Sequence, residues 1–514
     1  MRSFNSEKMD IPIAAAGLVF AVLAFRWLTR RSSPRIPGPR AHPFVGHIFQ
    51  VPKVKTWKYM ERLWHEYGPI VKLTLAGDDL LILNDPADAE ALLGRRSKIY
   101  SSRRPLVYAG KYMSGNMRLT LLPYGDNLKK QRAAFHGMLQ PRAIGGYEDM
   151  QHDTSLQLLV NLYRTPQDFY THFPRFPASL IFTMSFGQKM KEDNKDLAAV
   201  QGVLYDFVRD SNPGAHLVDT FPILDKLPDF LSPWRAEAKR KHEDTIGLYR
   251  RLALDVKKRM EKDPELECFT ARLWEQQAKM NLTDDELYYV SGSAFAAGTD
   301  TSSITLLWFV FAMATNPETM KKAQREIDSF FDANTLPNFS KMQELRYCFA
   351  LMKEVIRWSP IAPLSFPHYL DADDEYKGYH IKKGTTVISN LWNMHHTESE
   401  FPDSYTFNPD RFMDKKAGTG DVADRLGDDI YGFGFGRRAC PGQHLAAKST
   451  WIAVVRTLWA FDIVPEKDEL GHPKFLDIDD CSNGLTSRPN PFPATFVPRS
   501  SAHIDTIMAS YERI

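Results

Sequence analysis

The chain has 514 residues, of which 43% are hydrophobic and 25% charged, and its formal net charge is +2. This near-neutral balance argues against a strongly basic nucleic-acid-binding protein and against an acidic scaffold. A chain of this length can bury a large hydrophobic core and does not need disulfides or structural metals to be stable. The four cysteines form no C-x-x-C pair and are too few for a disulfide framework, which excludes a zinc cluster of that type and favours a reducing compartment.

The amino terminus carries an apolar run, IPIAAAGLVFAVLAFRWL, over residues 11–28. It is long enough to span a bilayer as a helix. We expect a transmembrane signal anchor at 11–29 after a lumenal tail at 1–10. Arginines follow the run more densely than cations precede it, which places the rest of the chain in the cytosol. A cleaved secretory signal is the alternative interpretation.

A Pro-rich basic linker over residues 30–46 separates this segment from the body. Residues 68–84 predict a β-hairpin, and helical periodicity dominates from 85 to 365. Short strands are expected again within 374–389 and 492–498. The pattern predicts a mainly α fold with small β-sheets. It forms one body over residues 47–500, followed by a C-terminal tail at 501–514.

One long helix is predicted over residues 283–316. Thr283 and Glu286 form a capping box at its start, and Asn316 precedes Pro317, which is suited to open the next helix. The middle of the helix reads Gly-Thr-Asp-Thr at 298–301, which is a poor choice of residues for a buried helix centre. The alternative is that Thr301 only bonds back to the Ala297 carbonyl and bends the helix.

Two further segments attract attention because of their charges. Glu354 and Arg357 lie three residues apart in a helical stretch and can pair on one face. An ordinary surface ion pair, worth about 0–1 kcal/mol, is the alternative. Arg411 follows in the segment FNPDRF at 407–412.

The segment FGFGRRACPG, residues 433–442, places Cys440 among arginines and glycines. Neighbouring cations and backbone N–H groups favour a thiolate. Pro441 then begins a helical stretch. From the residues alone, Cys440 is a nucleophile, a metal ligand or a buried loop cysteine. His444 is the nearest base for a nucleophile, but its position on the helix directs the ring away from the sulfur.

The same segment resembles the heme-binding loop of the cytochrome P450 heme-thiolate monooxygenases, F-x-x-G-x-R-x-C-x-G. All five fixed positions are matched, by Phe433, Gly436, Arg438, Cys440 and Gly442. The resemblance implies that Cys440 is the axial ligand of heme iron (heme b, iron protoporphyrin IX) and that Arg438 contacts a heme propionate. It also implies that Phe433 packs near the sulfur and tunes its donor strength.

Other segments agree with this resemblance. EVIR at 354–357 matches the family's E-x-x-R helix and implies a structural network of Glu354, Arg357 and Arg411. AGTDT at 297–301 resembles the oxygen-activating helix. It implies that Thr301 holds dioxygen and a water, while Asp300 supplies protons.

Two matches are looser. PYGDNLKKQR at 123–132 resembles the W-x-x-x-R helix of the family and implies that Arg132 meets a propionate, although Leu128 stands where tryptophan is usual. PLSFPHYL at 363–370 implies that His368 is a further propionate contact. A solvated strand residue is the alternative for His368.

The resemblance implies a cytochrome P450 fold preceded by one transmembrane helix. The 47–500 body would be a heme-binding monooxygenase domain that inserts one oxygen atom from O2 into a lipophilic small molecule. The chain resembles fungal microsomal members of the O-methylsterigmatocystin oxidoreductase-like type. That resemblance suggests terpenoid, polyketide or indole secondary metabolites as substrates, and a single-pass location in the endoplasmic reticulum membrane with the catalytic domain facing the cytosol.

We expect a monomeric catalytic unit that binds a lipid bilayer and no nucleic acid. Electrons would come from NADPH through NADPH–cytochrome P450 reductase, because no flavin or dinucleotide domain is present. Candidate docking cations are Arg437, Lys129 and Lys130, with solvated surface as the alternative. The family layout places the substrate pocket along 101–122, 295–299, 361–366 and 483–486. A heme-thiolate isomerase or dehydratase that uses no O2, and a membrane-tethered heme sensor or carrier, are the alternative functions.

Overall fold

A computed structural model of the chain describes residues 34–190, 195–212, 214–413, 426–472, 474 and 476–513. The predicted tail and anchor at 1–29, and the first residues of the linker, lie outside the described residues. Within the described residues, one helix, α13 (Asp284–Thr315), has the length and hydropathy of a membrane span. Because 78% of its most apolar window is buried inside the protein, α13 is the central helix of the core.

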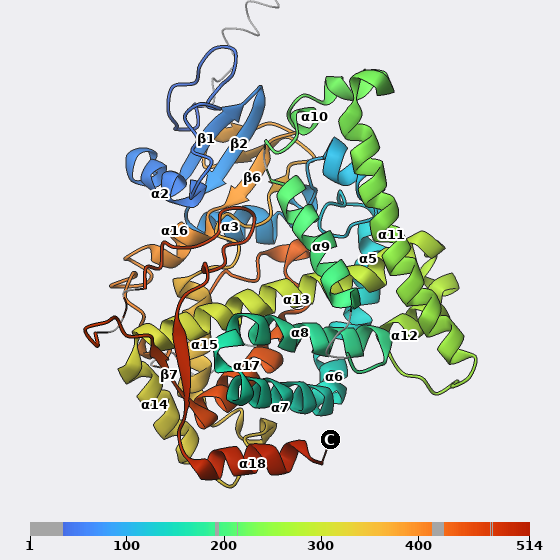
Figure 1. Ribbon diagram of the computed structural model, residues 1–514. Helices are drawn as coiled ribbons and strands as arrows, with labels where there is room; N and C mark the ends of the chain where they lie inside the picture. Colours follow the sequence, from blue (N-terminus) through green and yellow to red (C-terminus); the bar gives the residue numbers. More distant parts are fainter. Residues whose placement is uncertain are drawn as a thin grey trace, which may run out of the picture.

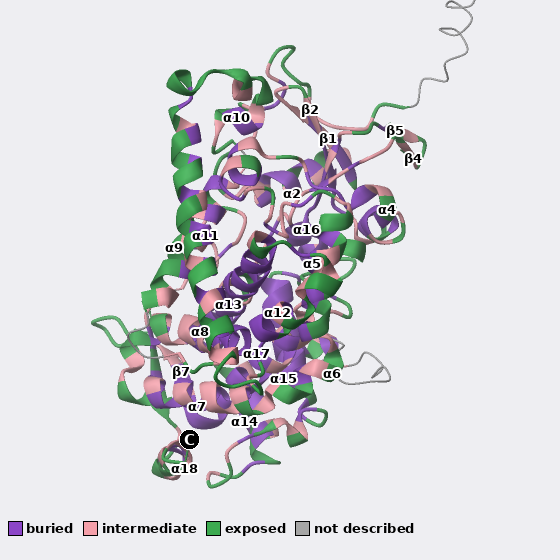
Figure 2. Cartoon of the chain, turned by 90° about the vertical axis from the view of Figure 1, so that its right-hand side faces the viewer, coloured by how far each residue is buried: buried purple, intermediate pink, exposed green. Residues whose placement is uncertain are grey.

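The body is mainly helical with small sheets, and α13 crosses its centre (Figure 1). The longer helices around it are α2 (Thr56–Tyr67), α5 (Asp126–Leu139), α7 (Glu148–Arg164), α8 (Phe169–Phe186), α9 (Lys195–Asp210), α11 (Pro233–Met260), α12 (Phe269–Met280), α14 (Pro317–Asp328), α15 (Arg346–Trp358), α17 (Gln443–Ala460) and α18 (Ser501–Tyr511). Viewed from the side, α13 is buried along its length while α9 and α11 expose their outer faces (Figure 2).

The predicted long helix and its cap are confirmed. Thr283 Oγ1 accepts a hydrogen bond from the Glu286 N–H at 3.3 Å, and the Glu286 carboxylate accepts from the Thr283 N–H at 2.9 Å. The helix ends at Thr315. Asn316 does not cap α14 with its side chain. Its side-chain amide instead donates to the Ala312 carbonyl at 2.9 Å, which also accepts the Asn316 backbone N–H at the end of α13.

Most strands lie where the sequence predicts them, but the strand at Phe461–Pro465 was not predicted. β1 (Ile70–Leu75) and β2 (Asp78–Leu83) form an antiparallel hairpin, and β2 pairs in parallel with β6 (Thr386–Ser389). β3 (His368–Tyr369) closes the sheet in the order β1-β2-β6-β3. Two-stranded ribbons are formed by β4 (Asp374–Tyr376) with β5 (Tyr379–Ile381), and by β7 (Phe461–Pro465) with β8 (Ala494–Pro498).

The core divides along α13. Its carboxyl-terminal half packs with α15, α17 and β7 in the largest apolar cluster, and its amino-terminal half packs with α8, α11 and α12 in a second one. Phe295 shows how closely α13 meets α8, because its ring lies 5.5 Å from that of Phe182 and 6.3 Å from that of Phe186.

The carboxyl terminus differs from the prediction of a tail at 501–514. Residues Ser501–Tyr511 form α18, which packs against α7 (Figure 1). Ile504 and Ile507 are buried on this face, and the Tyr511 hydroxyl donates to Gln157 at 2.8 Å. The segment is therefore part of the helical body. It is held by the apolar face of α18, which the sequence analysis did not identify in residues 501–514.

Candidate active site

The Cys440 loop turns on a glycine that has no allowed replacement. Gly436 adopts a left-handed backbone with φ +52°, and a Cβ atom there would lie 2.3 Å from the Leu93 carbonyl oxygen. The turn continues through the short helix η11 (Gly436–Arg438). The Cys440 N–H then donates to the Phe433 carbonyl at 2.8 Å, so the two ends of the loop are tied together just before α17.

Cys440 is exposed and lines an open cavity of 560 Å³ formed by α5, its own loop and the start of α17. Desolvation by the protein around the sulfur raises the pKa of Cys440, although the Gly442 N–H and the Arg132 guanidinium oppose the shift. Desolvation therefore acts against the flanking cations and N–H groups that we expect to favour a thiolate. A thiol with a raised pKa is a poor free nucleophile, whereas a bound metal ion deprotonates a coordinating thiol outright.

Arg438 lies beside a second arginine that the sequence did not single out. Arg438 donates to the Ser101 carbonyl at 2.6 Å and to the Leu122 carbonyl, and Arg103 donates to the Phe366 carbonyl at 2.7 Å. Burial lowers the pKa of Arg438 to about 10, with Arg132 adding to the shift and Asp371 opposing it. Burial and the charge of Arg438 lower the pKa of Arg103.

His368 belongs to the same cluster. It begins β3, is only 4% exposed, and its Nδ1 lies 2.7 Å from the Tyr100 carbonyl. Burial lowers its pKa well below the usual value, and the charges of Arg103 and Arg438 add to that shift. The alternative of a solvated strand residue is therefore wrong. β3 is the edge strand of its sheet, but the His368 side chain is buried next to Arg103 and Arg438.

Arg132 and Leu128 lie on α5 next to the loop. Arg132 donates to the Ala439 carbonyl at 3.0 Å and so touches the residue before Cys440. Leu128 is buried and lines the same cavity. It fills that position with apolar surface and provides no N–H donor.

These groups fit a heme. Arg103, Arg132 and Arg438 have backbone carbonyls as partners and form no ion pair with a carboxylate in the part of the chain that the structure describes. Three guanidinium groups brought close together without acidic partners favour an anionic ligand. Heme carries two propionates, and Cys440 provides a thiol in the same loop as Arg438 and at the same cavity as Arg132. The sequence contains no motif that marks Arg103 as a donor at this site, because Arg103 meets Arg438 only in the folded protein.

The centre of α13 opens into the interior. Almost every residue in the middle of this helix is buried, but Ala297 and Thr301, one turn apart, are exposed. The Thr301 hydroxyl donates to the Ala297 carbonyl at 3.0 Å, so the hydrogen bond to the helix backbone that the alternative interpretation expects is formed. α13 packs against both α17 and α5, the two helices beside the Cys440 cavity.

Asp300 lies next to this face with one partner. The Arg488 guanidinium donates to its carboxylate at 2.5 Å from the loop that follows residue 483. Burial raises the pKa of Asp300, and the positive charge of Arg488 opposes this. Arg488 was not expected from the sequence, since it is 188 residues away from Asp300.

The pocket stretch predicted at 295–299 is only partly right. Phe295 points toward α8, and a Cβ on Gly298 would lie 3.0 Å from Ile181 of the same helix. Thr299 is buried and donates to the Phe295 carbonyl at 2.8 Å. Of this stretch, Ala297 faces the open interior, because helical geometry turns positions 295 and 298 to the opposite side.

The predicted Glu354, Arg357 and Arg411 network is present. Arg357 donates twice to Glu354, at 2.7 and 2.8 Å, and both side chains are 0% exposed. Arg411 donates to Glu354 at 3.2 Å. Arg357 also donates to the carbonyls of His395 and Ser404, so the pair is a core element that ties α15 to the segment before the heme loop and not a surface ion pair.

The predicted docking cations differ from one another. Lys130 pairs with Glu286 at 2.7 Å and binds α5 to the start of α13, so it is committed within the fold. Lys129 is exposed and pairs with Asp126 at 3.0 Å. Arg437 is exposed and donates to the Tyr124 hydroxyl. Arg437 and Lys129 therefore remain as surface cations beside the Cys440 loop.

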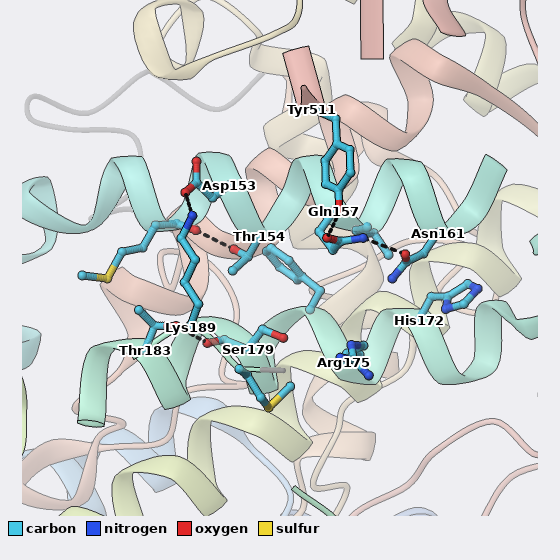
Figure 3. A pocket seen from close by; sticks show the side chains of 14 residues that line it. Asp153, Thr154, Gln157, Asn161, His172, Arg175, Ser179, Thr183, Lys189 and Tyr511 are labelled. Carbon is cyan, nitrogen blue, oxygen red and sulfur yellow. Dashed lines mark hydrogen bonds and ion pairs between the residues drawn. The ribbon is translucent and has the colours of Figure 1, made fainter. Parts of the chain in front are cut away.

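A separate pocket of 430 Å³ lies between α7, α8 and α18 (Figure 3). Its polar side chains largely satisfy one another: Lys189 pairs with Asp153 at 3.0 Å, and Gln157 donates to Asn161 at 2.9 Å. None of the predicted site residues lines it. We therefore assign the functional site to the Cys440 cavity.

Comparison with known proteins agrees with this geometry. Residues 36–492 match the family model described as Cytochrome P450. The chain is 33% identical to Cytochrome P450 monooxygenase 58 of Postia placenta, over 98% of this chain and 95% of that protein. It is 32% identical to Cytochrome P450 monooxygenase virE of Hypocrea virens, over 98% and 93%, and 31% identical to Cytochrome P450 monooxygenase fogE of Aspergillus ruber, over 95% and 92%.

Proposed function

The chain belongs to the cytochrome P450 family of monooxygenases, and from that premise we propose that it oxygenates a lipophilic small molecule in fungal secondary metabolism. One oxygen atom of O2 would enter a C–H bond, and the other would leave as water with two protons and two electrons. The observation that carries the proposal is the open face of α13 at Ala297 and Thr301, next to Asp300, in a helix that is otherwise buried.

The residues around Cys440 would hold the cofactor. Cys440 would ligate the iron, and Arg103, Arg132, Arg438 and His368 would surround the propionates. When bound, a thiolate-ligated heme supplies the activation of O2 and the cleavage of its O–O bond. Phe433 is half-buried in the loop, and its carbonyl accepts the Cys440 N–H, which ties the two ends of the loop together.

Thr301 and Asp300 would deliver protons. The Thr301 hydroxyl can hold a water in the open interior, because its side chain is accessible there. The raised pKa of Asp300 keeps a proton available at higher pH than an exposed aspartate would. Arg488 holds the carboxylate and sets how readily that proton is released.

We propose that the electrons come from NADPH through a membrane-bound reductase. Arg437 and Lys129 are exposed cations close to Cys440, which suits the docking of an acidic partner. A heme-thiolate isomerase would have no use for the proton-delivering pair at positions 300 and 301, and neither would a heme carrier. Consumption of NADPH with mass gain of one oxygen in the product separates the monooxygenase from both.

We also propose that the protein lies on the cytosolic face of the endoplasmic reticulum membrane. Large apolar side chains are exposed in two segments, with Phe44 at 87% and Phe230 at 82%. α10 (Leu217–Thr220), which opens the second segment, lies at the same end of the molecule as the β1–β2 hairpin (Figure 1). Exposed apolar groups gathered at one end support contact with a bilayer in addition to the predicted anchor.

The decisive experiment is the carbon monoxide spectrum of the reduced protein. Wild type and Cys481→Ala, which alters a buried cysteine elsewhere, should show the strongly red-shifted Soret band of a thiolate ligand. Cys440→Ala should lose this band. Retention of the band in Cys440→Ala would overturn the assignment of the ligand. Microsomes with reductase and a terpenoid, polyketide and indole panel, read by mass spectrometry, then test the substrate class.

A further inference from the structure

Arg118 is a buried cation that the proposed chemistry does not use. Its side chain is 5% exposed, and its Nε and Nη2 atoms have no hydrogen-bond partner among the described residues. It forms no ion pair within that part of the chain. One face of the guanidinium lies against the Phe207 ring of α9, 4.1 Å from the ring centre. A buried guanidinium without an acidic partner is costly, so its presence needs an explanation.

The backbone that carries Arg118 is held firmly. The Met117 carbonyl accepts from Gln131 at 3.0 Å, and the Leu119 carbonyl accepts from Arg438 at 3.4 Å. The side chain therefore starts from a segment tied to the edge of the heme site. It reaches away from the arginines there, because its neighbours belong to α9, α11 and α13.

The Arg118 guanidinium lies near two tyrosines, Tyr249 and Tyr289. Burial raises the pKa of Tyr249 on α11, and both the charge of Arg118 and a side-chain interaction with it oppose this shift. For Tyr289 on α13, the charge of Arg118 opposes the rise in pKa that burial causes. The Tyr289 hydroxyl is occupied by His242 Nδ1 at 2.9 Å, whereas the Tyr249 hydroxyl is buried beside the Arg118 guanidinium. The Tyr249 ring packs on Gly292, where a Cβ would lie 2.2 Å from it.

A further orphan group lies one turn along α13. The Ser293 hydroxyl is buried and has no partner in the described part of the chain. At 100° per residue, Tyr289, Ser293 and Asp300 lie within about 40° of one another on the helix. Phe295 and Gly298, which face α8, lie on the opposite side. On the same count, Ala297 lies about 40° and Thr301 about 80° from Ser293 around the helix, so the open positions lie beside the line through Tyr289, Ser293 and Asp300.

We propose that Arg118 binds the carboxylate of a lipophilic acid substrate, with the Tyr249 and Ser293 hydroxyls as further hydrogen-bond donors. A carboxylate matches the two free guanidinium nitrogens with a bidentate pair. The rise of the helix places Ser293 about 12 Å and Tyr289 about 18 Å before Thr301, so the oxidised carbon lies far from the acid group. This inference rests on the proposed monooxygenase function and names the substrate class of that same site.

The test uses the full-length holoprotein and two probes, dodecanoate and methyl dodecanoate, titrated by calorimetry below their micelle concentrations. Wild type should bind the acid about tenfold or more tightly than the ester, since one charge-assisted pair is worth at least that factor. Arg118→Met should abolish the preference, and Arg118→Lys should keep part of it. Lys111→Met, which removes an exposed cation of the same segment, should leave it unchanged.

Several outcomes would overturn the inference. One is equal affinity for acid and ester in wild type, or no binding of the acid. Another is a preference that survives in Arg118→Met. Loss of heme from a folded Arg118→Met protein would assign the arginine to a propionate instead. If Arg118→Met does not fold, Tyr249→Phe, which removes only one hydroxyl, should still weaken acid binding more than ester binding. The carbon monoxide spectrum of each preparation shows separately whether the monooxygenase assignment stands.

Discussion

Arg357 and Arg118 are both buried arginines, but the protein treats them in opposite ways. Arg357 is 0% exposed and its donors are met by Glu354 and by the carbonyls of three further residues. Arg118 is 5% exposed and keeps two nitrogens without a partner in the described residues. A buried cation that serves the fold is satisfied by the chain itself. One that is left unsatisfied, in a protein that binds small molecules, is available for a ligand.

Other buried charges fall between these two. Among the described residues, Arg103 and Arg438 have carbonyl partners but no acidic one, and the Asp300 carboxylate has a single partner in Arg488. The number of internal partners decreases from the α15 core toward the open face of α13. We therefore expect that mutating a residue with fewer internal partners lowers the stability of the fold less and changes ligand binding or catalysis more.

The largest loss of stability is expected at Arg357, whose hydrogen-bond donors are all met within the chain. Arg357→Ala leaves Glu354 buried and charged, which should lower the free energy of unfolding by about 3–5 kcal/mol and impair heme incorporation. Denaturant unfolding of the holoprotein measures this. The exposed pair of Arg272 with Glu267 provides the control, since Arg272→Ala should cost no more than about 1 kcal/mol. Similar losses for both variants would remove the distinction.

The proton-delivering pair should show a large effect on coupling and a small one on folding. Thr301→Ala and Asp300→Asn should lower product formed per NADPH by about 10²-fold, with peroxide released in its place, while the carbon monoxide band survives. Thr305→Ala, whose hydroxyl also bonds back to a helix carbonyl, is the matched control. An unchanged ratio in both site variants would leave positions 300 and 301 with a structural role only.

The same pair predicts a pH dependence with a definite sign. Because burial raises the pKa of Asp300, the folded protein binds this proton more tightly than the unfolded chain does. Its contribution to stability is complete below the unfolded pKa and is lost as pH rises through the folded pKa. Arg488→Gln removes the opposing charge, so the alkaline limb of the coupling profile should move to higher pH. A shift to lower pH would contradict this.

An intermediate effect is expected at the heme edge. Arg103→Met should weaken heme retention by about 2 kcal/mol, because one charge-assisted hydrogen bond to a propionate is lost. Transfer of heme to an apoprotein acceptor measures this, and circular dichroism of the remaining apoprotein should be unchanged. Arg456→Met is a useful control, since that buried arginine also donates to carbonyls but lies among α7 and α17. Equal heme loss in both variants would count against a propionate contact.

The smallest change in stability is expected at Arg118. Arg118→Met removes an unpaired buried charge, so the free energy of unfolding should stay the same or rise by up to about 1 kcal/mol. Thermal unfolding without added acid measures this. A loss as large as that of Arg357→Ala would show that Arg118 serves the fold, and the contrast between the two arginines would be wrong.

The sequence was sufficient wherever the relevant contacts are local. The capping box at Thr283 and the pairing of Glu354 with Arg357 join residues within a few positions of one another, so spacing alone predicts them. The role of the Cys440 loop came from its resemblance to a family motif. The family resemblance supplied Arg411, Arg132 and His368 in the same way, by matching short motifs. The hairpin at 68–84 and the long central helix follow from periodicity.

Only the tertiary structure decided which side chains are buried without partners and which meet across the chain. Arg103 converges with Arg438, and Arg488 with Asp300, over hundreds of residues, while Lys130 is withdrawn from the surface by Glu286. Phe295 turns to α8, α18 joins the body, and Arg118 is enclosed by three helices. Local patterns specify bonds within a turn, but burial depends on how distant segments pack, and no short stretch of sequence contains that information.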